Sequence, residues 1–277
     1  MNKIYKVFPG GKFKVLTFSY DDGKIEDRRL VKLFNKYNLK ATFNLNTGII
    51  DPAIRIPQEE WPELYADHDI AVHTFTHPTM IRLNDYAVIR EILEDKNNLE
   101  KIFHRPITGF AYPNGSFDSR IVDIAKSVGI KYARVTNDRY AATKAAENYA
   151  SSADGPIPIG DENGFFMPDD YMRWVPTCHH NHNLIDFGKK FMALTKKQYL
   201  YMMYVWGHSY EFERNNNWEV IENFCEMIAN RDDIWYATNS EFFSDNEYVH
   251  NPSVKSVWLA VNNDTIIEVK GGETVKL

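Results

Sequence analysis

The sequence predicts an α/β fold: a distorted (β/α) barrel of about seven units with a small β-rich appendage at its C-terminal end. Two observations indicate this class. Strand-like apolar runs alternate with segments of helical periodicity, and each run is continuously apolar. Continuous apolar strands are typical of a parallel sheet that helices cover on both faces. The length of 277 residues suits one such barrel, and a doubly wound open sheet is the competing arrangement.

The expected elements follow one another along the chain. The apolar runs predict strands at 14–20, 41–46, 69–72, 107–112, 130–135, 171–177, 201–206 and 234–237. Helical spacing predicts helices at 26–37, 59–66, 85–104, 117–128, 184–194 and 217–229. Asp27, Asn84 and Ser116 are the expected N-caps of three of these helices.

The chain is expected to divide into a barrel at 1–250 and a β-rich extension at 251–277. The extension carries three short β-type runs separated by turn residues. It is too short to fold alone, so we expect it to pack on the barrel. A stretch at 136–170 has little periodicity, and a loop of that length is either functional or an insertion.

Composition excludes several classes of function. The net charge is −6 and no Lys/Arg cluster is visible, which argues against a nucleic-acid partner. Cys178 and Cys225 lie far apart without a CxxC partner, so they are expected in the core, and one isolated bridge stays open. No signal peptide and no run long enough to span a bilayer are visible, so we expect a cytoplasmic protein without a membrane partner.

Polar residues follow several of the predicted strands. Asp21 and Asp22 end the first, and His73, the run 112–114 and His208 come after later ones. The C-terminal ends of parallel strands share one face, where active sites of α/β folds are built. These residues are therefore expected to meet at one site.

The spacing of two histidines favours a metal at this site. His73 and His77 are four residues apart, which lets both imidazoles reach one ion, and a carboxylate would complete three ligands. Asp21 and Asp22 can then divide the work, one as ligand and the other as proton acceptor. The alternative is a turn with ordinary hydrogen-bonded histidines. The position of both groups after buried strands favours the metal.

Four segments resemble motifs of the polysaccharide deacetylases, family 4 of the carbohydrate esterases, with the NodB-type homology domain. Residues 17–23 (TFSYDDG) are similar to the first motif and 73–77 (HTFTH) to the second. Residues 110–115 (FAYPNG) resemble the third, and 206–208 (WGH) stand where the fifth would be. The resemblance implies a distorted (β/α) barrel, a divalent metal, usually zinc, and removal of N-acetyl or O-acetyl groups from sugars.

The resemblance also implies roles for single residues. Asp21 would be the general base, and His208 the general acid that protonates the leaving amine. The divalent metal, expected to be Zn²⁺, would be held by Asp22, His73 and His77. Substrate contacts and the oxyanion site would come from Tyr112, Pro113 and Asn114, with a backbone N–H near Asn114 as oxyanion donor.

The sequence departs from the family pattern at the third and fourth motifs. Ala111 stands where the family has an arginine that contacts the base aspartate, and Asn114 replaces an aromatic residue. A subset that acts on poly-N-acetylglucosamine resembles this Phe-Ala-Tyr-Pro form. What holds Asp21 is therefore unexplained by the sequence. Arg173 and Trp174 are the candidates for the fourth motif.

A second histidine cluster, at 179–182, has two interpretations. His179 and His180 are the candidates for contact with the substrate, although histidines satisfied by other groups, or a second metal site, are alternatives.

Together these observations predict a metal-dependent hydrolase that removes an acetyl group from an N-acetylated or O-acetylated sugar or oligosaccharide. One alternative is a related barrel hydrolase acting on a non-sugar linear or cyclic amide. The other is a catalytically silent carbohydrate-binding barrel.

Overall fold

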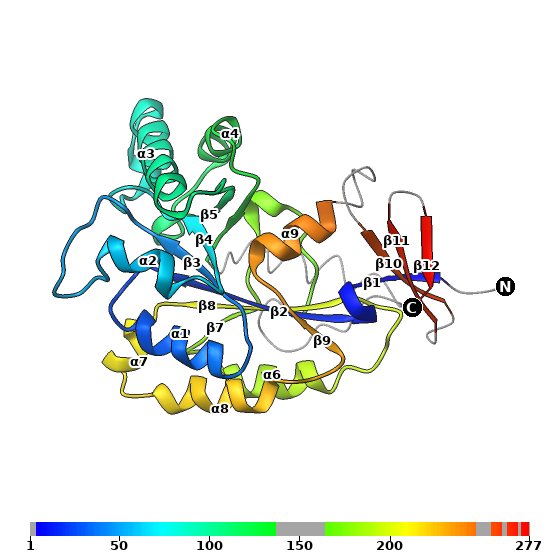
Figure 1. Ribbon diagram of the computed structural model, residues 1–277. Coiled ribbons are helices and arrows are strands. Elements are labelled where there is room, and N and C mark those ends of the chain that lie inside the picture. Colours follow the sequence, from blue (N-terminus) through cyan, green and yellow to red (C-terminus); the bar gives the residue numbers. More distant parts are fainter. Residues whose placement is uncertain (1–3, 137–163, 248–255, 262–264, 271–272, 277) are drawn as a thin grey trace.

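Parallel strands form the main body of the protein (Figure 1). The computed structural model describes residues 4–136, 164–247, 256–261, 265–270 and 273–276. Within them the larger sheet runs in the order β6-β5-β4-β3-β2-β8-β7, and β9 also pairs with β2. Its strands are β2 (Lys14–Asp21), β3 (Thr42–Leu45), β4 (Asp69–Val72), β5 (Gly109–Ala111), β6 (Tyr132–Arg134), β7 (Cys178–His179), β8 (Tyr201–Gly207) and β9 (Ile234–Tyr236).

Strand β2 is the axis of this sheet and positions the first acidic residues. All eight of its residues are buried. On one side it pairs with β8 along most of its length. On the other side β9 pairs with its beginning and β3 with its last three residues, 19–21. Asp21 therefore ends a strand that neighbours hold on both sides.

A short segment links the two edges of the sheet. Trp174 bridges Arg134 of β6, and its N–H donates to the Ala133 carbonyl at 2.9 Å. Three residues later, the Thr177 N–H donates to the Tyr204 carbonyl of β8 at 2.7 Å. The strands thus curl into the distorted barrel that the sequence predicts, and the open doubly wound sheet is wrong.

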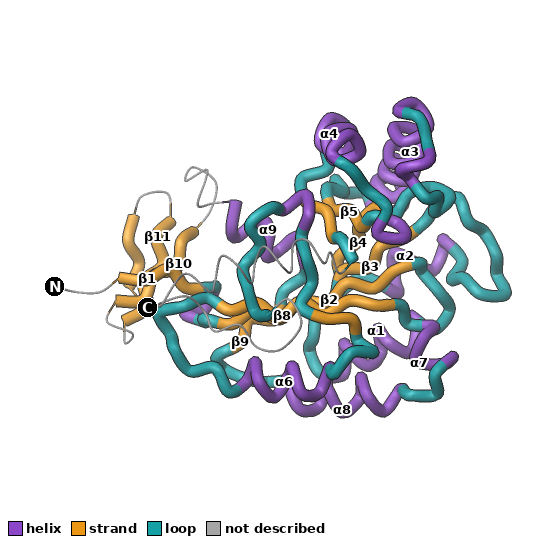
Figure 2. The backbone as a smooth tube through the Cα atoms, turned by 180° about the vertical axis from the view of Figure 1, so that it is seen from behind, coloured by secondary structure: helices purple, strands orange, loops and turns teal. Residues whose placement is uncertain are grey.

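Helices pack around the strands on their apolar faces (Figures 1 and 2). Helices α1 (Asp27–Lys36), α6 (Leu184–Met192) and α8 (Trp218–Ile228) lie together along one side of the sheet, and α3 (Asp85–Phe103) and α4 (Ser119–Ser127) lie over β4 and β5. The other helices of the described residues are α2 (Trp61–Leu64), α7 (Tyr210–Arg214) and α9 (Asn239–Glu247). Short 3-10 turns include η1 (Pro9–Gly11), η2 (Gln58–Glu60), η3 (Met80–Arg82), η4 (Pro113–Gly115) and η5 (Tyr171–Arg173).

A second, antiparallel sheet contains the predicted C-terminal β extension. Its order is β1-β10-β11-β12, made of β1 (Ile4–Val7), β10 (Ser256–Val261), β11 (Thr265–Lys270) and β12 (Glu273–Lys276). It lies near the beginning of β2 (Figure 2), whereas Asp21 is the last residue of that strand. The β appendage is confirmed, but it also takes in β1, which we expected in the barrel at 1–250. The division into two domains stays a prediction.

The hydrogen bonds confirm one of the three predicted helix N-caps and correct the other two. The Asn84 cap is confirmed, because its Oδ1 accepts the Ala87 N–H at 2.9 Å. Ser116 is not a cap: α4 begins after Asp118, which accepts the Ile121 N–H at 2.8 Å. Asp27 is not a cap either, since it is buried and accepts the Tyr65 hydroxyl at 2.7 Å.

Other predictions fail because the segments are short or irregular. The run 171–177, predicted as a strand, is the turn η5 followed by extended chain, and β7 begins only at Cys178. Helices α7 and α9 were not predicted. Most of the loop predicted at 136–170 lies outside the described residues. Both cysteines are buried and no disulfide joins them, so the isolated bridge left open above is absent. In the described part of the chain, no helix is both long and apolar enough to cross a membrane.

Candidate active site

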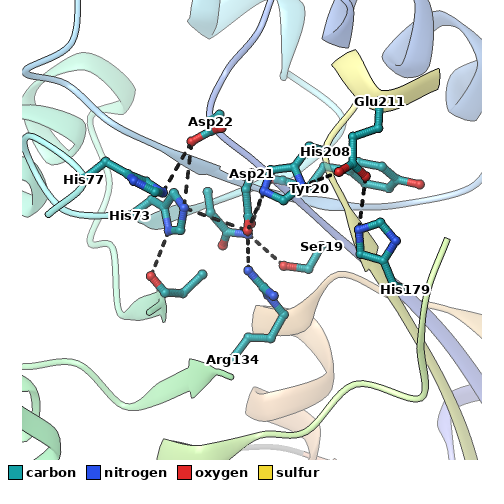
Figure 3. A network of polar contacts seen from close by, with 12 residues as sticks. Ser19, Tyr20, Asp21, Asp22, His73, His77, Arg134, His179, His208 and Glu211 are labelled. Atoms are coloured by element: carbon teal, nitrogen blue, oxygen red, sulfur yellow. Dashed lines mark hydrogen bonds and ion pairs between the residues drawn. The ribbon is translucent and has the colours of Figure 1, made fainter. Parts of the chain in front are cut away.

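The five residues expected to carry the chemistry lie together at the C-terminal ends of the strands (Figure 3). Asp21 ends β2 and Asp22 follows it, while His73 and His77 follow β4 and His208 follows β8. His73 Nε2 lies 3.8 Å, and His208 Nε2 3.9 Å, from Asp21 Oδ2. The side chains of His77 and His208 are 25% and 20% exposed, so solvent reaches the site from their side.

Three of these residues form a group suited to a metal ion. Asp22 Oδ1 lies 3.9 Å from His73 Nε2 and 3.7 Å from His77 Nε2. Asp22 Oδ1 and His73 Nε2 are buried and have no hydrogen-bond partner. Two buried lone-pair atoms that face each other are costly unless something shared satisfies them. A divalent cation between the three side chains fits this donor set.

The orientation of His73 agrees with a ligand role. Its Nδ1 lies 2.8 Å from the Ala111 carbonyl oxygen, which can only accept, so Nδ1 carries the hydrogen. Burial lowers the pKa of His73 to about 4, so the ring is neutral near pH 7. Nε2 therefore presents a free lone pair toward Asp22. A second nitrogen held by a carbonyl is the usual support of a metal-binding histidine.

Helix α3 fixes the backbone that carries these histidines. Asp95 accepts the His73 N–H at 3.0 Å and also the N–H and hydroxyl of Thr47, at 2.7 and 2.8 Å. Glu91 accepts the N–H and hydroxyl of Thr76, both at 2.7 Å. The loop between β4 and η3 is therefore held at two points by one helix.

Asp21 is a buried carboxylate held in its charged form. It is 3% exposed, and its Oδ1 accepts an N–H from Asn44 at 2.7 Å. Its Oδ2 accepts an N–H from Arg134 at 2.5 Å. Burial alone would raise the pKa of Asp21, but Arg134 above all, with His73 and His208, lowers it to about 2. Each oxygen keeps a second lone pair, so the carboxylate can still accept a proton.

Arg134 provides the arginine contact to Asp21 that Ala111 cannot make. It is the last residue of β6 and the direct partner of Ala111 in the pairing of β5 with β6. The guanidinium that contacts Asp21 thus comes from the strand next to the expected position. It is 1% exposed, and its Cζ lies 4.5 Å from the centre of the Trp206 ring. The sequence contained a signal: an arginine near the C-terminal end of an apolar strand run, the position that also marked Asp21.

His208 faces a second carboxylate that the sequence analysis missed. Its Nδ1 lies 3.6 Å from Glu211 Oε1, while its Nε2 points toward Asp21 (Figure 3). Glu211 stands one helical turn further on, and its N–H donates to the His208 carbonyl at 3.1 Å. Burial lowers the pKa of His208, but the carboxylates of Glu211, Asp21 and Asp22 outweigh it, so the pKa is raised.

The second histidine cluster is built around the same carboxylate. His179 Nε2 and His180 Nε2 each lie 3.1 Å from Glu211 Oε2. The Asn181 N–H donates to His179 Nδ1 at 3.2 Å, so the proton of this neutral ring is on Nε2 and points at Glu211. In that state His179 is a hydrogen-bond donor to Glu211, although the ligand atoms of His179, His180 and Glu211 are also close enough together to hold a metal ion. His180 is 1% exposed and stacks on Phe212 at 4.1 Å, so it has no free surface for a substrate.

The third-motif residues separate into core and surface. Tyr112 is buried, and its hydroxyl donates to the Met172 carbonyl at 3.0 Å. Pro113 is buried too. Asn114 is exposed and has a positive φ of 56°, in the turn η4, which begins two residues after the end of β5. Of the three, Asn114 is the residue exposed to solvent.

Of the two candidates for the fourth motif, one is a core residue and the other is exposed. Trp174 is 1% exposed and packs against Tyr204 and Phe242, with ring centres 4.8 and 5.1 Å apart. Arg173 forms an exposed ion pair with Asp170 at 2.9 Å. Trp174 is therefore a core residue that links β6 and β8.

Comparison with known proteins shows a similarity to one family over part of the chain. The sequence profile of the polysaccharide deacetylase family matches residues 9–133. A putative polysaccharide deacetylase of Bacillus subtilis, YxkH, is 25% identical over half of this chain and half of its own length. The chain spans half or less of the length of the curated relatives it matches.

Solved structures agree on the fold. The putative polysaccharide deacetylase of Mycobacterium smegmatis superposes with a TM-score of 0.60 at 14% identity, over 89% of this chain and 94% of that one. A family 4 acetyl xylan esterase of Clostridium thermocellum, solved with a cobalt ion, gives 0.51 at 14% identity, over 83% and 90%. The profile match over residues 9–133, the barrel fold and the four motif segments make this chain similar to the polysaccharide deacetylases.

Proposed function

We propose that this protein is a metal-dependent hydrolase that removes an acetyl group from an N-acetylated sugar or oligosaccharide. The observation that carries the proposal is the pair of unpartnered ligand atoms, Asp22 Oδ1 and His73 Nε2, beside the charged, buried carboxylate of Asp21. A cation site next to a free carboxylate and a partly exposed histidine is the donor set that amide hydrolysis needs.

Asp22, His73 and His77 would hold a divalent cation, for which Zn²⁺ is the expected ion because two imidazoles and one carboxylate suit it. Such an ion would supply Lewis acidity and lower the pKa of a water molecule to about 7. The protein's own residues would transfer the protons and stabilise the oxyanion.

In the proposed reaction, Asp21 accepts a proton from water as the water oxygen attacks the acetyl carbonyl carbon. The backbone N–H near Asn114 donates to the oxyanion that forms. His208 then gives the proton on Nε2 to the leaving nitrogen, the C–N bond breaks, and acetate and the free amine result. Arg134 keeps Asp21 ionised, and Glu211 keeps His208 protonated and turned toward the substrate. General acid–base catalysis of this kind contributes about 10²–10⁴-fold to the rate.

The test is zinc content measured together with acetate release from N-acetylglucosamine oligomers. We expect about one zinc ion per wild-type chain, and acetate release that a chelator abolishes and zinc restores. Asp22→Ala should lose both the ion and the activity, because it removes the oxygen that faces both imidazoles. The matched control is His182→Ala, an exposed histidine outside the site, which should keep both.

Zinc retained in full by Asp22→Ala would refute the ligand set. A metal-loaded wild-type protein that releases no acetate from N-acetylated or O-acetylated sugars would refute the substrate class. Amide cleavage on a non-sugar substrate would then identify the related hydrolase, and sugar binding without turnover the silent barrel.

A further inference from the structure

A buried arginine lies beside the proposed metal ligands, and nothing in the proposed reaction uses it. Arg55 comes from the loop between β3 and η2 and is 8% exposed. Its Nη2 lies 3.9 Å from Asp22 Oδ1, the atom that faces the two histidines. A fixed positive charge at that distance repels a cation. Arg55 must therefore make a favourable contribution to the site that is larger than this repulsion.

The hydrogen bonds of Arg55 go to backbone and amide groups. Its Nη1 donates to the main-chain carbonyl of Asp22 and to Asn46 Oδ1, the latter at 3.2 Å. Asn46 is 1% exposed, and its Nδ2 donates to the carbonyls of His73 at 2.5 Å and Thr74 at 3.0 Å. Two side chains thus connect the backbone of the ligand after β2 with the backbone of the ligand after β4.

The segments they connect are strained. Asp22, Thr74 and His77 have φ values of 84°, 66° and 56°, in the left-handed region that residues with a Cβ rarely adopt. Such conformations cost of order 1–3 kcal/mol each and persist only where the surroundings fix them. The carbonyls that Arg55 and Asn46 hold belong to two of the strained residues, Asp22 and Thr74, and to the neighbouring ligand His73.

We propose that Arg55 and Asn46 form a clamp that sets the spacing and direction of the metal ligands, so that they are positioning residues of the metal centre. The inference rests on the proposed function for the identity of the site, but it concerns residues that are not ligands. It predicts that the loss of either side chain weakens metal binding, although every ligand is kept.

Two substitutions separate positioning from electrostatics by the sign of their effect. Arg55→Met removes a positive charge, and Asn46→Asp adds a negative charge while it loses the two N–H donors to the carbonyls of His73 and Thr74. Electrostatics alone predicts tighter binding of a cation in both variants. The clamp predicts weaker binding in both, by about 10–100-fold, as is typical when groups that orient metal ligands are lost.

The measurement is the dissociation constant for Zn²⁺, obtained by competition with a chromogenic chelator, on wild-type protein and variants stripped of metal. Thermal unfolding of the stripped proteins is recorded in parallel, and Arg55→Lys tests whether charge without the planar fork restores affinity. The matched control is Arg105→Met. Arg105 pairs with the buried Asp69 at 3.2 Å, at the other end of β4. It should lose stability and keep zinc affinity.

The expected result is weaker Zn²⁺ binding in both clamp variants, weaker than in Arg105→Met even where the melting temperatures match, with Arg55→Lys recovering only part of the loss. Unchanged or tighter binding in Arg55→Met or Asn46→Asp overturns the clamp and leaves the proposed function standing. Wild-type protein that binds no zinc overturns the proposed function first.

Discussion

The candidate active site has a base side and an acid side, and these two sides are built in different ways. On the base side (Asp21, Asn44 and Arg134), three residues from three different strands converge, and Arg134 is 113 positions away from Asp21. On the acid side (His208 and Glu211), one helical turn supplies both members, three positions apart. The first arrangement depends on the register of the sheet. In the second, the contact between the two members is local, although His179 and His180 also lie against Glu211.

The base side is also more deeply buried than the acid side. The side chains of Asp21 and Arg134 are 3% and 1% exposed, whereas that of His208 is 20% exposed. A buried ion pair leaves an uncompensated charge when one partner is removed, which is far more costly than the loss of an exposed contact. The base side should therefore control both folding and activity, and the acid side mainly activity.

The largest effect is expected for Arg134→Met, which leaves the Asp21 carboxylate buried without its cation. The free energy of unfolding should fall by about 3–5 kcal/mol. Acetate release should fall by about 10²-fold or more, because Asp21 is no longer held in place. Urea unfolding gives the first quantity and an acetate assay the second.

The control for this prediction is Arg173→Met, which breaks an exposed pair with Asp170 and should change the free energy of unfolding by less than about 1 kcal/mol. The double variant Arg134→Met with Asp21→Asn should regain part of the lost stability, since no unpaired charge remains. Equal destabilisation by Arg134→Met and Arg173→Met would contradict the conclusion that the buried pair of the base side contributes more to stability than an exposed pair.

The same contrast explains how much of the site the sequence could predict. Asp21, Asp22, His73, His77 and His208 each follow a recognisable strand run, so their convergence follows from the parallel fold alone. Asn44 lies inside β3 and Arg134 ends β6, and the contact of both with Asp21 depends on which strands are neighbours and on their register. Glu211 stands on a five-residue helix, which is too short to produce a periodic pattern.

The fold was predictable for a related reason. Long strands and helices with regular apolar spacing, such as β2 and α3, were identified close to their observed limits. The segment that links the edges of the barrel was not, because Trp174 lies in extended chain outside any regular strand. The pairing of β1 with β10 joins residues from the two ends of the chain, which no local pattern indicates.

A smaller and mainly kinetic effect is expected for Glu211→Gln. The carboxylate raises the pKa of His208, so its removal should lower that pKa and shift the alkaline limb of kcat/KM to lower pH. Asp21 and, further away, Asp22 remain as negative groups facing His208. The rings of His179 and Tyr210 lie 6.3 and 5.3 Å from its ring. We expect kcat to fall by about 10–10²-fold, and the free energy of unfolding by about 1 kcal/mol.

Glu213→Gln is the matched control, because Glu213 lies on the same helix and accepts the Trp218 indole N–H at 2.9 Å, away from His208. Its pH profile should follow the wild type. An alkaline limb that does not move in Glu211→Gln would show that His208 is not the proton donor or that Glu211 does not act on it. A loss of stability as large as that of Arg134→Met would contradict the acid side's local construction.

The smallest effect is expected at Trp206, the residue that contacts both sides. Its ring centre lies 4.5 Å from Arg134 Cζ and 5.8 Å from the centre of the His208 ring. Trp206→Phe keeps an aromatic face but weakens the interaction with the guanidinium, which should cost about 0.5–1 kcal/mol of unfolding free energy and a few-fold in rate.

Double-mutant cycles then test whether the two sides are separate. Trp206→Phe should couple to Arg134→Met by about 0.5–1 kcal/mol, because the interaction it weakens is already absent there. With Glu211→Gln it should be additive within about 0.5 kcal/mol. If Trp206 coupled to Glu211 as strongly as to Arg134, the indole would join the two sides into one network, and the acid side would depend on the register of the sheet as the base side does.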